Sequence, residues 1–171
     1  MKTNKKERFI STIDNHKKII YKIVNSYCQN KEDRKDLEQE IIIQLWNSFD
    51  KYKAEYKYST WMYRIALNVA ISFYRKEKKW TTKNDFYNEE SIFSIDEDRN
   101  EEETELDYHL KLLQEFIQNL NELNKALMLL YIEEKSHEEI AEILGITKTN
   151  VATKISRLKS KLKEEFKKNI K

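Results

Sequence analysis

The chain has 171 residues, with 36% charged and 39% apolar side chains, one glycine and no proline. Because sheet proteins draw many of their turns from glycine and proline, this composition excludes most all-β folds and favours long helices joined by short polar connections. The length allows one ordinary domain or two small ones, and the single cysteine, Cys28, excludes an internal disulfide.

The N-terminal stretch and the apolar runs bear on where the protein works. Residues 1–10 are polar and basic and lack the apolar core of a signal peptide. No apolar run approaches the roughly 20 residues that span a bilayer. A single unpaired cysteine fits a reducing compartment. We therefore predict a cytoplasmic protein without membrane insertion.

A small net charge of +2 conceals a strong segregation along the chain. Residues 1–84 hold 19 basic and 10 acidic side chains, and residues 108–171 hold 12 and 9. Residues 85–107, between them, hold 1 and 11. Basic segments attract polyanions such as nucleic acid through counterion release. A lysine-rich surface that only keeps helices soluble explains the charge equally well, so other features must decide.

Apolar residues at helical spacing predict three helices in the first 80 residues. The first covers residues 9–27, and the second begins at an N-cap on Asp33. The third runs from a cap on Ser59 or Thr60 to about Lys79, after a loop over residues 50–60. The residues expected to face the core are Phe9, Ile13, Ile20, Val24 and Tyr27 in the first helix, Leu37, Ile41, Leu45 and Phe49 in the second, and Trp61, Ile65, Ala66, Val69 and Phe73 in the third.

The predicted loop and third helix interleave aromatic and basic side chains. Single-stranded nucleic acid is bound by this combination, because ring faces stack on bases while cations hold phosphates. Alternatively the rings belong to the core, which the apolar stripe favours for Trp61, whereas Tyr52 lies between two lysines and is expected to be exposed. This segment alone does not decide between the two interpretations. The interleaved residues are Lys51, Tyr52, Lys53, Tyr56, Lys57, Tyr58 and Trp61, followed by Arg64, Asn68 and Arg75 on one polar side of the helix.

Residues 81–107 are acidic and nearly free of aliphatic periodicity, apart from Ile92, Phe93 and Ile95. We predict a mostly disordered linker there. It would separate a first domain over residues 1–80 from a second over residues 108–171. Beyond it, apolar spacing predicts one helix with Leu110, Leu113, Ile117 and Leu120, and another with Leu123, Leu127, Leu130 and Tyr131.

The strongest local motif lies between residues 136 and 158. Ser136 and Glu139 have the spacing of a capping box at the start of a short helix. Gly145, the only glycine, follows where a positive φ lets a helix stop and turn sharply. Thr147 can cap the helix after it. Two helices joined by such a turn form a helix-turn-helix, whose second helix reads bases in the major groove. The buried side of the first helix is expected to hold Ile140, Ala141, Ile143 and Leu144.

The second helix of this motif combines an apolar side with a polar side that carries no acid between Lys148 and Lys163. A plain helical hairpin with a solvated lysine face is the alternative. Threonine, asparagine, lysine and arginine are the residue types used in base readout, which favours DNA. The apolar side is Val151, Ile155, Leu158, Leu162 and Phe166, and the candidate DNA contacts are Lys148, Thr149, Asn150, Thr153, Lys154, Arg157 and Lys161.

Two stretches resemble the sigma-70 family of RNA polymerase sigma factors, most closely its extracytoplasmic-function group. DRKDLEQEIIIQLWNSFDKY (33–52) with YSTWMYRIALNVAISFYRK (58–76) resembles region 2, and ELNKALMLLYIEEKSHEEIAEILGITKTNVATKISRLKSKL (122–162) resembles region 4. Their order, around an acidic variable linker, is that of the family. The resemblance implies an all-α protein of two small helical domains that binds core RNA polymerase and directs it to promoters.

The resemblance also implies which residues meet the polymerase and the promoter. The helix with the DLxQE motif is expected to dock on the coiled coil of the polymerase β′ clamp, and the partners of the family include the β flap and anti-sigma factors. Tyr52 would help to trap a flipped base of the minus-10 element, and Asn68 would meet that base in a pocket. Expected polymerase contacts are Asp36, Gln39, Glu40, Ile42 and Trp46; expected minus-10 contacts are Tyr52, Lys53, Tyr58, Trp61, Arg64, Asn68 and Arg75; the recognition helix would read the minus-35 element.

Such a protein needs no catalytic residue. Extruding a base costs a few kcal/mol, and stacking returns about 1–3 kcal/mol per base, so binding can drive melting. One glycine excludes a glycine-rich phosphate loop, and His16, His109 and His137 lie far apart without cysteine partners. We therefore expect no enzyme, cofactor or metal. Two alternatives are a helix-turn-helix regulator that does not dock on polymerase, and a nucleic-acid-processing enzyme that uses the acids of 96–107.

Two positions depart from the pattern of the family. Ala54 lies where family members often carry glycine, so the melting loop is expected to be tighter. Ala152 lies where many carry a basic residue, which removes one expected phosphate contact. Both departures bear on which promoter is recognised.

Overall fold

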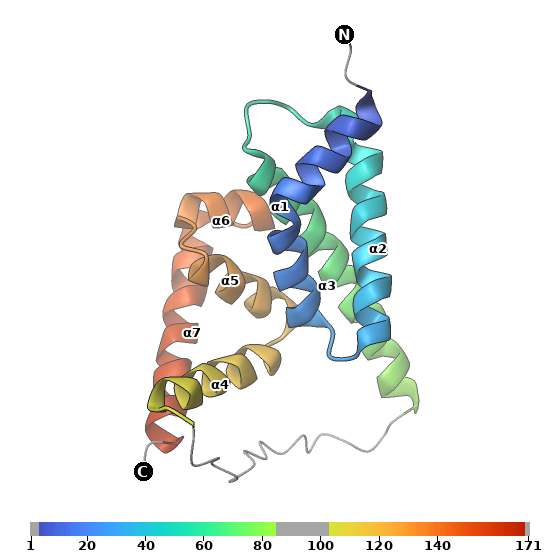
Figure 1. Cartoon of the computed structure of the whole chain (residues 1–171). Coiled ribbons are helices and arrows are strands. Elements are labelled where there is room, and N and C mark those ends of the chain that lie inside the picture. The colour runs from blue at the N-terminus through green and yellow to red at the C-terminus, as the bar shows by residue number, and fades with distance from the viewer. Residues whose placement is uncertain (1–3, 85–102, 170–171) are drawn as a thin grey trace.

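The computed structural model describes residues 4–84 and 103–169, and every regular element in these two ranges is a helix (Figure 1). The all-α prediction is therefore confirmed for the described part of the chain. The first half contains α1 (Lys5–Tyr27), α2 (Lys31–Ser48), the 3-10 turn η1 (Phe49–Lys51) and α3 (Tyr58–Asn84). The second half contains α4 (Glu105–Gln118), α5 (Glu122–Ile132), α6 (His137–Leu144) and α7 (Lys148–Asn169).

The start of α2 differs from the prediction. Asn30, not Asp33, is the N-cap, because its side-chain oxygen accepts a hydrogen bond from the backbone N–H of Asp33 at 2.8 Å. Asp33 instead lies in the first turn, where its negative charge favours the helix dipole. The predicted core stripe of this helix is confirmed, since Leu37, Ile41 and Leu45 are all fully buried.

The buried face of α3 is also displaced from the predicted one. Its fully buried residues include Met62, Ala66, Leu67 and Ala70. Trp61 and three other residues of the predicted stripe are only half-buried and pack around the margin of the core. The physical reason is that α3 packs against α1 and α2 and also against α5 and α6. A single amphipathic stripe cannot describe a helix that is covered on more than one side. The helix also begins at Tyr58, before the predicted caps on Ser59 and Thr60.

The predicted linker over 81–107 lies mostly outside the described residues, which omit 85–102. Both of its ends are helical, because α3 continues to Asn84 and α4 begins at Glu105. A capping box explains the early start of α4: the Thr104 hydroxyl accepts from the backbone N–H of Asp107 at 3.2 Å, and the Asp107 carboxylate accepts from the Thr104 N–H.

The two halves pack directly against each other. Helix α3 contacts α5 and α6, and α1 contacts α4 and α5. One cluster of buried side chains runs through both halves, from Phe9 in α1 to Leu158 in α7. Within the two described ranges, no helix has the length and apolar character needed to cross a membrane.

Candidate protein and nucleic-acid interfaces

The outer face of α2 carries most of the predicted polymerase contacts. Since Leu37, Ile41 and Leu45 turn inward, the side chains of Asp36, Gln39 and Glu40 are exposed on the opposite side of the helix. The structure thus brings the three polar residues of the DLxQE motif together on one accessible surface.

The apolar part of this face differs from the prediction. Ile42 is half-buried and packs against the core, whereas Ile43 is 55% exposed. Ile43 lies three residues after Glu40 and four after Gln39, so it belongs to the face of the motif. Sequence reasoning missed it because three consecutive isoleucines, 41–43, offer no periodicity by themselves. Spacing from the motif would have selected it.

Trp46 also lies on the outer face of α2, and two side chains of α1 pack against its ring. Its ring meets the Phe9 ring edge-on with centroids 5.1 Å apart, and the Lys5 ammonium lies 4.4 Å from its centroid. The indole is still 36% exposed. These contacts hold the ring in one position while leaving part of it accessible beside the polar motif.

The aromatic residues around η1 and the start of α3 form a stacked cluster. The Tyr52 ring lies on the Tyr58 ring with centroids 4.1 Å apart and planes 16° apart, and Trp61 meets Tyr52 edge-on at 5.6 Å. Burial, with the neighbouring Tyr58 phenol, raises the pKa of Tyr52. The prediction that Tyr52 is exposed is therefore wrong: it is half-buried, because the rings of Tyr58 and Trp61 pack against it.

The remainder of this loop points into solvent. Lys51, Lys53 and Lys57 are exposed, and the Tyr56 ring is 40% exposed. The backbone carbonyl of Tyr56 accepts a hydrogen bond from the Tyr52 hydroxyl, which ties the loop to the stacked cluster. Tyr56 is thus the ring that the loop leaves most accessible.

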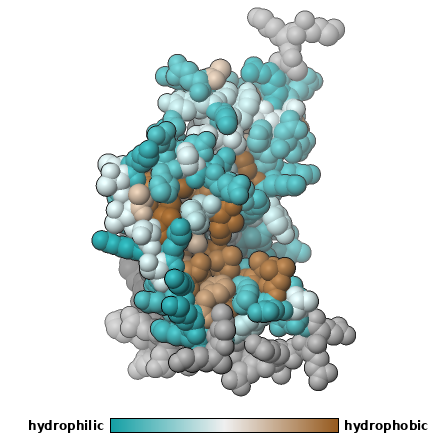
Figure 2. All heavy atoms as spheres, turned by 90° about the vertical axis from the view of Figure 1, so that its left-hand side faces the viewer, coloured by the Kyte–Doolittle hydropathy of each residue, from teal (hydrophilic) through white to brown (hydrophobic). Residues whose placement is uncertain are grey.

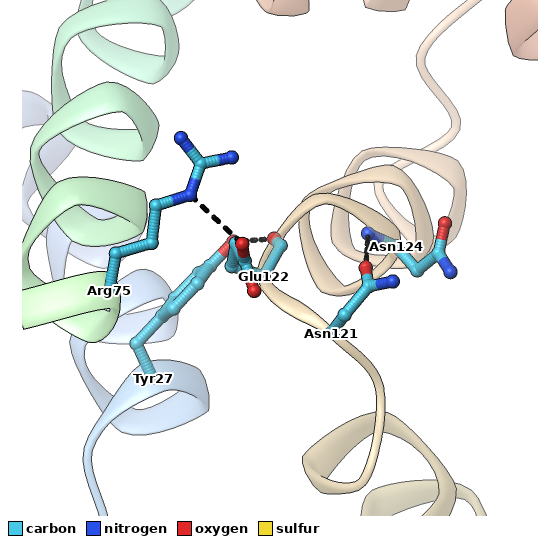
Figure 3. A network of polar contacts seen from close by, with 5 residues as sticks. All are labelled: Tyr27, Arg75, Asn121, Glu122 and Asn124. Atoms are coloured by element: carbon cyan, nitrogen blue, oxygen red, sulfur yellow. Dashed lines mark hydrogen bonds and ion pairs between the residues drawn. The ribbon is translucent and has the colours of Figure 1, made fainter. Parts of the chain in front are cut away.

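The polar side of α3 is divided between two environments. Arg64 and Asn68 are exposed one helical turn apart on the same side of α3. Arg75, two helical turns further along, directs its Nε to the Glu122 carboxylate of α5 at 2.9 Å (Figure 3). The structure therefore brings Arg64 and Asn68 together, whereas Arg75 forms an ion pair with a residue of the second half of the molecule.

The helix-turn-helix has the local geometry that the sequence predicts. The capping box of Ser136 and Glu139 is present at the start of α6. Gly145 ends that helix in the left-handed region, with φ of 68°. The Thr147 hydroxyl accepts from the backbone N–H of Asn150 at 3.1 Å at the start of α7. Each of these predictions is confirmed, and together they fix the direction of α7.

The side chains of α7 divide into a buried and an exposed side. Val151, Ile155 and Leu158 are buried against α5 and α6. Two of the exposed residues have local partners, since Lys148 pairs with Glu138 at 3.0 Å and the Thr153 hydroxyl donates to the Thr149 carbonyl. Of the predicted DNA contacts, Lys154 is half-buried, and the others are exposed: Lys148, Thr149, Asn150, Thr153, Arg157 and Lys161.

The surface of α7 around Ala152 is hollowed and carries lysines. Ala152 lines a hollow of about 390 Å³ together with Lys159 and Lys163. Two lysines therefore line the same hollow as Ala152. Among the described residues, no group of three or more histidine, cysteine, aspartate or glutamate side chains is placed to hold a metal ion.

The side of the molecule that carries α6, α7 and α4 also presents apolar surface. Figure 2 shows polar side chains over much of this face, with apolar atoms gathered in its middle and lower part. On α4, Leu106 and Leu110 are 66% and 48% exposed. Because Leu106 and Leu110 lie four residues apart, they share one face of α4.

Comparison with known proteins gives two family matches in the same order as the predicted motifs. Residues 12–80 match the model described as Sigma-70 region 2, and residues 110–162 match the one described as Sigma-70, region 4. Among curated relatives, the RNA polymerase sigma factor SigV of Bacillus subtilis is 29% identical over 157 residues, which cover 91% of this chain and 89% of that protein. The ECF RNA polymerase sigma factor SigW of the same organism is 26% identical over 181 residues, covering 97% and 92%.

Two solved structures share the fold of this chain. One is CnrH in complex with the cytosolic domain of CnrY, with a TM-score of 0.65, 18% identity, and coverage of 95% of this chain and 89% of that one. The other is the sigma factor RpoE in complex with the anti-sigma factor NepR from Bartonella quintana, with a TM-score of 0.66, 18% identity, and coverage of 95% and 96%. At this identity the likeness concerns the fold alone.

Proposed function

This chain belongs to the extracytoplasmic-function group of the sigma-70 family, and we propose which of its residues bind core RNA polymerase and promoter DNA. It is a non-enzymatic sigma factor that binds core RNA polymerase and directs promoter-specific initiation. The observation that carries the residue assignments is that α2 and α7, which bear the two family motifs, bury one side and present the motif side chains on the other.

The exposed face of α2 is proposed as the surface that docks on the β′ clamp coiled coil. Asp36, Gln39 and Glu40 supply charges and amide groups, and Ile43 supplies the apolar centre among them. Trp46, held by Phe9, extends the same face. Ile42 is assigned a packing role, because it contacts the core of the first half. Interfaces of this composition have an apolar centre within a polar rim.

The minus-10 element is proposed to open against the aromatic cluster and the polar side of α3. Tyr58 covers one face of the Tyr52 ring at 4.1 Å, so an extruded base can stack only on the other face or on the accessible Tyr56 ring. Asn68 can hydrogen-bond the edge of that base. The cations proposed to hold the phosphates are Lys53, Arg64 and Arg75, and Trp61 packs behind the Tyr52 ring.

The minus-35 element is proposed to lie against the N-terminal part of α7. Residues near the N-terminus of a recognition helix contact base edges in the major groove. Asn150 and Arg157 have the side chains suited to adenine and guanine, respectively. The remaining contacts proposed are Lys148, Thr149, Thr153, Lys154 and Lys161, of which Lys154 contributes least surface because it is half-buried.

Further protein partners are proposed from the apolar surface of α4. Leu106 and Leu110 lie on the second half, where the family meets the polymerase β flap. Both fold relatives named above are solved as complexes, one with an anti-sigma factor and one with the cytosolic domain of CnrY, and we propose that an anti-sigma factor restrains this chain as well. We propose that the protein works in the cytoplasm, where core polymerase and promoter DNA are found.

In vitro transcription tests the proposed function. The purified protein is combined with core polymerase and genomic DNA, and the start sites are sequenced. We expect transcripts from a defined set of promoters that core polymerase alone ignores. If the combination starts no transcript beyond those made by core alone, the proposed function is wrong.

The alternative of a regulator that does not dock on polymerase is tested at α2. Asp36→Ala combined with Gln39→Ala should abolish core binding and transcription if α2 docks, and should leave DNA-linked function intact if it does not. Glu38→Ala is the matched control, because Glu38 lies two residues from Asp36 and therefore on another side of the helix. It should retain core binding.

A further inference from the structure

The two halves of the molecule meet at the first turn of α5. Glu122, the first residue of that helix, directs its carboxylate to Nε of Arg75 on α3 at 2.9 Å. Its backbone carbonyl accepts a hydrogen bond from the Tyr27 hydroxyl of α1 at 2.6 Å, so both side chains converge on one residue (Figure 3). The Glu122 side chain is 18% exposed. One residue of the second half therefore engages two helices of the first.

Lys125, one turn further along α5, deepens this contact. Its side chain is 3% exposed, and its ammonium lies 5.3 Å from the centroids of both the Tyr27 and the Tyr74 rings. Lysine is almost never fully buried without a partner, and a cation over an aromatic face is attracted more strongly when water is excluded. The Tyr27 ring of α1 and the Tyr74 ring of α3 thus both contact the buried ammonium group of Lys125, which belongs to the second half.

The other end of α5 and the turn after it are also held by the first half. Lys22 of α1 forms an ion pair with Glu133, and the Lys135 ammonium lies 5.7 Å from the centroid of the Tyr63 ring of α3. Helix α5 is therefore held at both ends against the same two helices.

This closed arrangement cannot contact both promoter elements at once. Elements about 25 base pairs apart are separated by about 85 Å of B-form DNA at 3.4 Å per base pair. Helix α7 is separated from α3 only by α5 and α6, a distance of about two helix spacings of 8–10 Å each. The two halves must separate before α3 and α7 can occupy the minus-10 and minus-35 elements together.

We propose that the first turn of α5 is an intramolecular latch, in which Glu122 occupies Arg75 in the free protein and releases it when promoter DNA is bound. A carboxylate offers a guanidinium the same anionic oxygens as a DNA phosphate. Glu122 and the minus-10 strand therefore compete for the Nε of Arg75. The rest of this side chain, which is 62% exposed overall, stays accessible in the closed molecule. The inference rests on the proposed function, which assigns Arg75 to that strand.

The first test compares Glu122→Gln with Glu164→Gln in the full chain without polymerase. Both variants remove one negative charge from the second half, but Glu164 is exposed on α7 and lies outside the latch. Small-angle scattering reports closure, and fluorescent oligothymidylate reports contact with a single strand. We expect Glu122→Gln to have the larger radius of gyration. It should also bind the oligonucleotide about two- to fivefold more tightly than Glu164→Gln does. This range of affinities corresponds to the free energy of a partly exposed ion pair.

Two further variants separate the latch from a general change in charge. Arg75→Ala should open the molecule as Glu122→Gln does but bind oligothymidylate more weakly than the wild-type chain. Tyr27→Phe keeps the ring that packs against Tyr74 and removes only the hydroxyl that holds the Glu122 carbonyl, so it should also open the molecule. Together with Glu122→Gln it should open the molecule further than either change alone.

The outcomes separate the latch from the proposed function. If Glu122→Gln and Tyr27→Phe stay as compact as the wild-type chain, and Glu122→Gln binds oligothymidylate no better than Glu164→Gln, the latch is overturned even if the chain initiates transcription with core polymerase. If the wild-type chain initiates nothing, the proposed function fails while the scattering comparison still decides whether Glu122 closes the molecule.

Discussion

The helix-turn-helix and the aromatic cluster are both assigned to promoter DNA, but they are held together by different kinds of interaction. In the helix-turn-helix, the capping box of Ser136 and Glu139, the turn at Gly145 and the cap of Thr147 on Asn150 each act within a few residues. In the aromatic cluster, Tyr52 is positioned by rings at Tyr58 and Trp61, outside its own segment.

This difference suits the two kinds of DNA contact. A helix fixed by its own caps presents side chains in a constant arrangement, which suits readout of base edges in an intact duplex. A stacked ring pair is worth about 0.5–1.5 kcal/mol beyond the area it buries, while a base on an aromatic ring is worth about 1–3 kcal/mol. An extruded base that stacks on the uncovered face of Tyr52 or on Tyr56 therefore adds to the ring pair, and it need not displace Tyr58.

The largest expected effect comes from removing the packing behind the recognition helix. Ile140 is fully buried in α6, and Ile140→Ala should lower the free energy of unfolding by about 2–5 kcal/mol, because it leaves a cavity. Urea denaturation measures the loss. Ile132→Ala is the control, since Ile132 is 45% exposed and its truncation should cost about 0.5 kcal/mol or less. Equal losses in the two variants would show that α6 is not packed as described.

The next effect concerns readout by α7. Arg157→Ala should weaken binding to minus-35 duplex by about 1–3 kcal/mol if the side chain reads a base, and by a similar amount on all sequences if it holds phosphate. Affinities for matched and mismatched duplexes distinguish the two. An unchanged affinity on both duplexes would remove Arg157 from the interface.

How far each region could be predicted follows from the same contrast. Ser136, Gly145 and Thr147 were predictable because each satisfies a rule of local geometry. The pairing of Arg75 with Glu122 spans 47 residues of sequence, and no local pattern indicates it. The buried face of α3 was misplaced for a related reason. The predicted stripe contained Ala66, which is fully buried, but it missed Met62, Leu67 and Ala70, because helices from both halves cover α3.

The outer face of α2 lies between these two cases. Its DLxQE motif was recognisable, and its core stripe followed from spacing. The choice of Ile42 over Ile43 was wrong, because Ile42 packs against the core and Ile43 is exposed. Spacing from Gln39 and Glu40, rather than the run of isoleucines, would have selected Ile43. If the α2 assignment is right, Ile43→Ser should weaken core binding more than Ile42→Val does, by about 1–2 kcal/mol for loss of one buried aliphatic contact. Titration of core polymerase with labelled protein measures the difference, and the reverse order would restore Ile42 to the interface.

A further prediction tests whether the turn is held by backbone conformation alone. A Cβ placed on Gly145 would meet no atom within 4 Å, so steric clash contributes nothing. Gly145→Ala should still cost about 1 kcal/mol of stability, because φ of 68° is strained for a residue with a side chain. Gly145→Asn should cost less, since asparagine tolerates the left-handed region. Thermal unfolding ranks the two, and a larger loss for Asn would indicate a contact that this geometry does not contain.

The smallest expected effect lies in the aromatic cluster. Tyr52→Phe keeps the ring stacked on Tyr58 and removes only the hydroxyl that donates to the Tyr56 carbonyl. At this half-exposed position water can replace the bond, so stability should fall by about 0.5 kcal/mol or less. Promoter opening, followed by a fluorescent base analogue in the minus-10 element, should be retained in Tyr52→Phe and reduced in Tyr52→Leu, because the base needs the ring face and not the hydroxyl. Loss of opening in Tyr52→Phe would instead assign the hydroxyl a direct role at the flipped base.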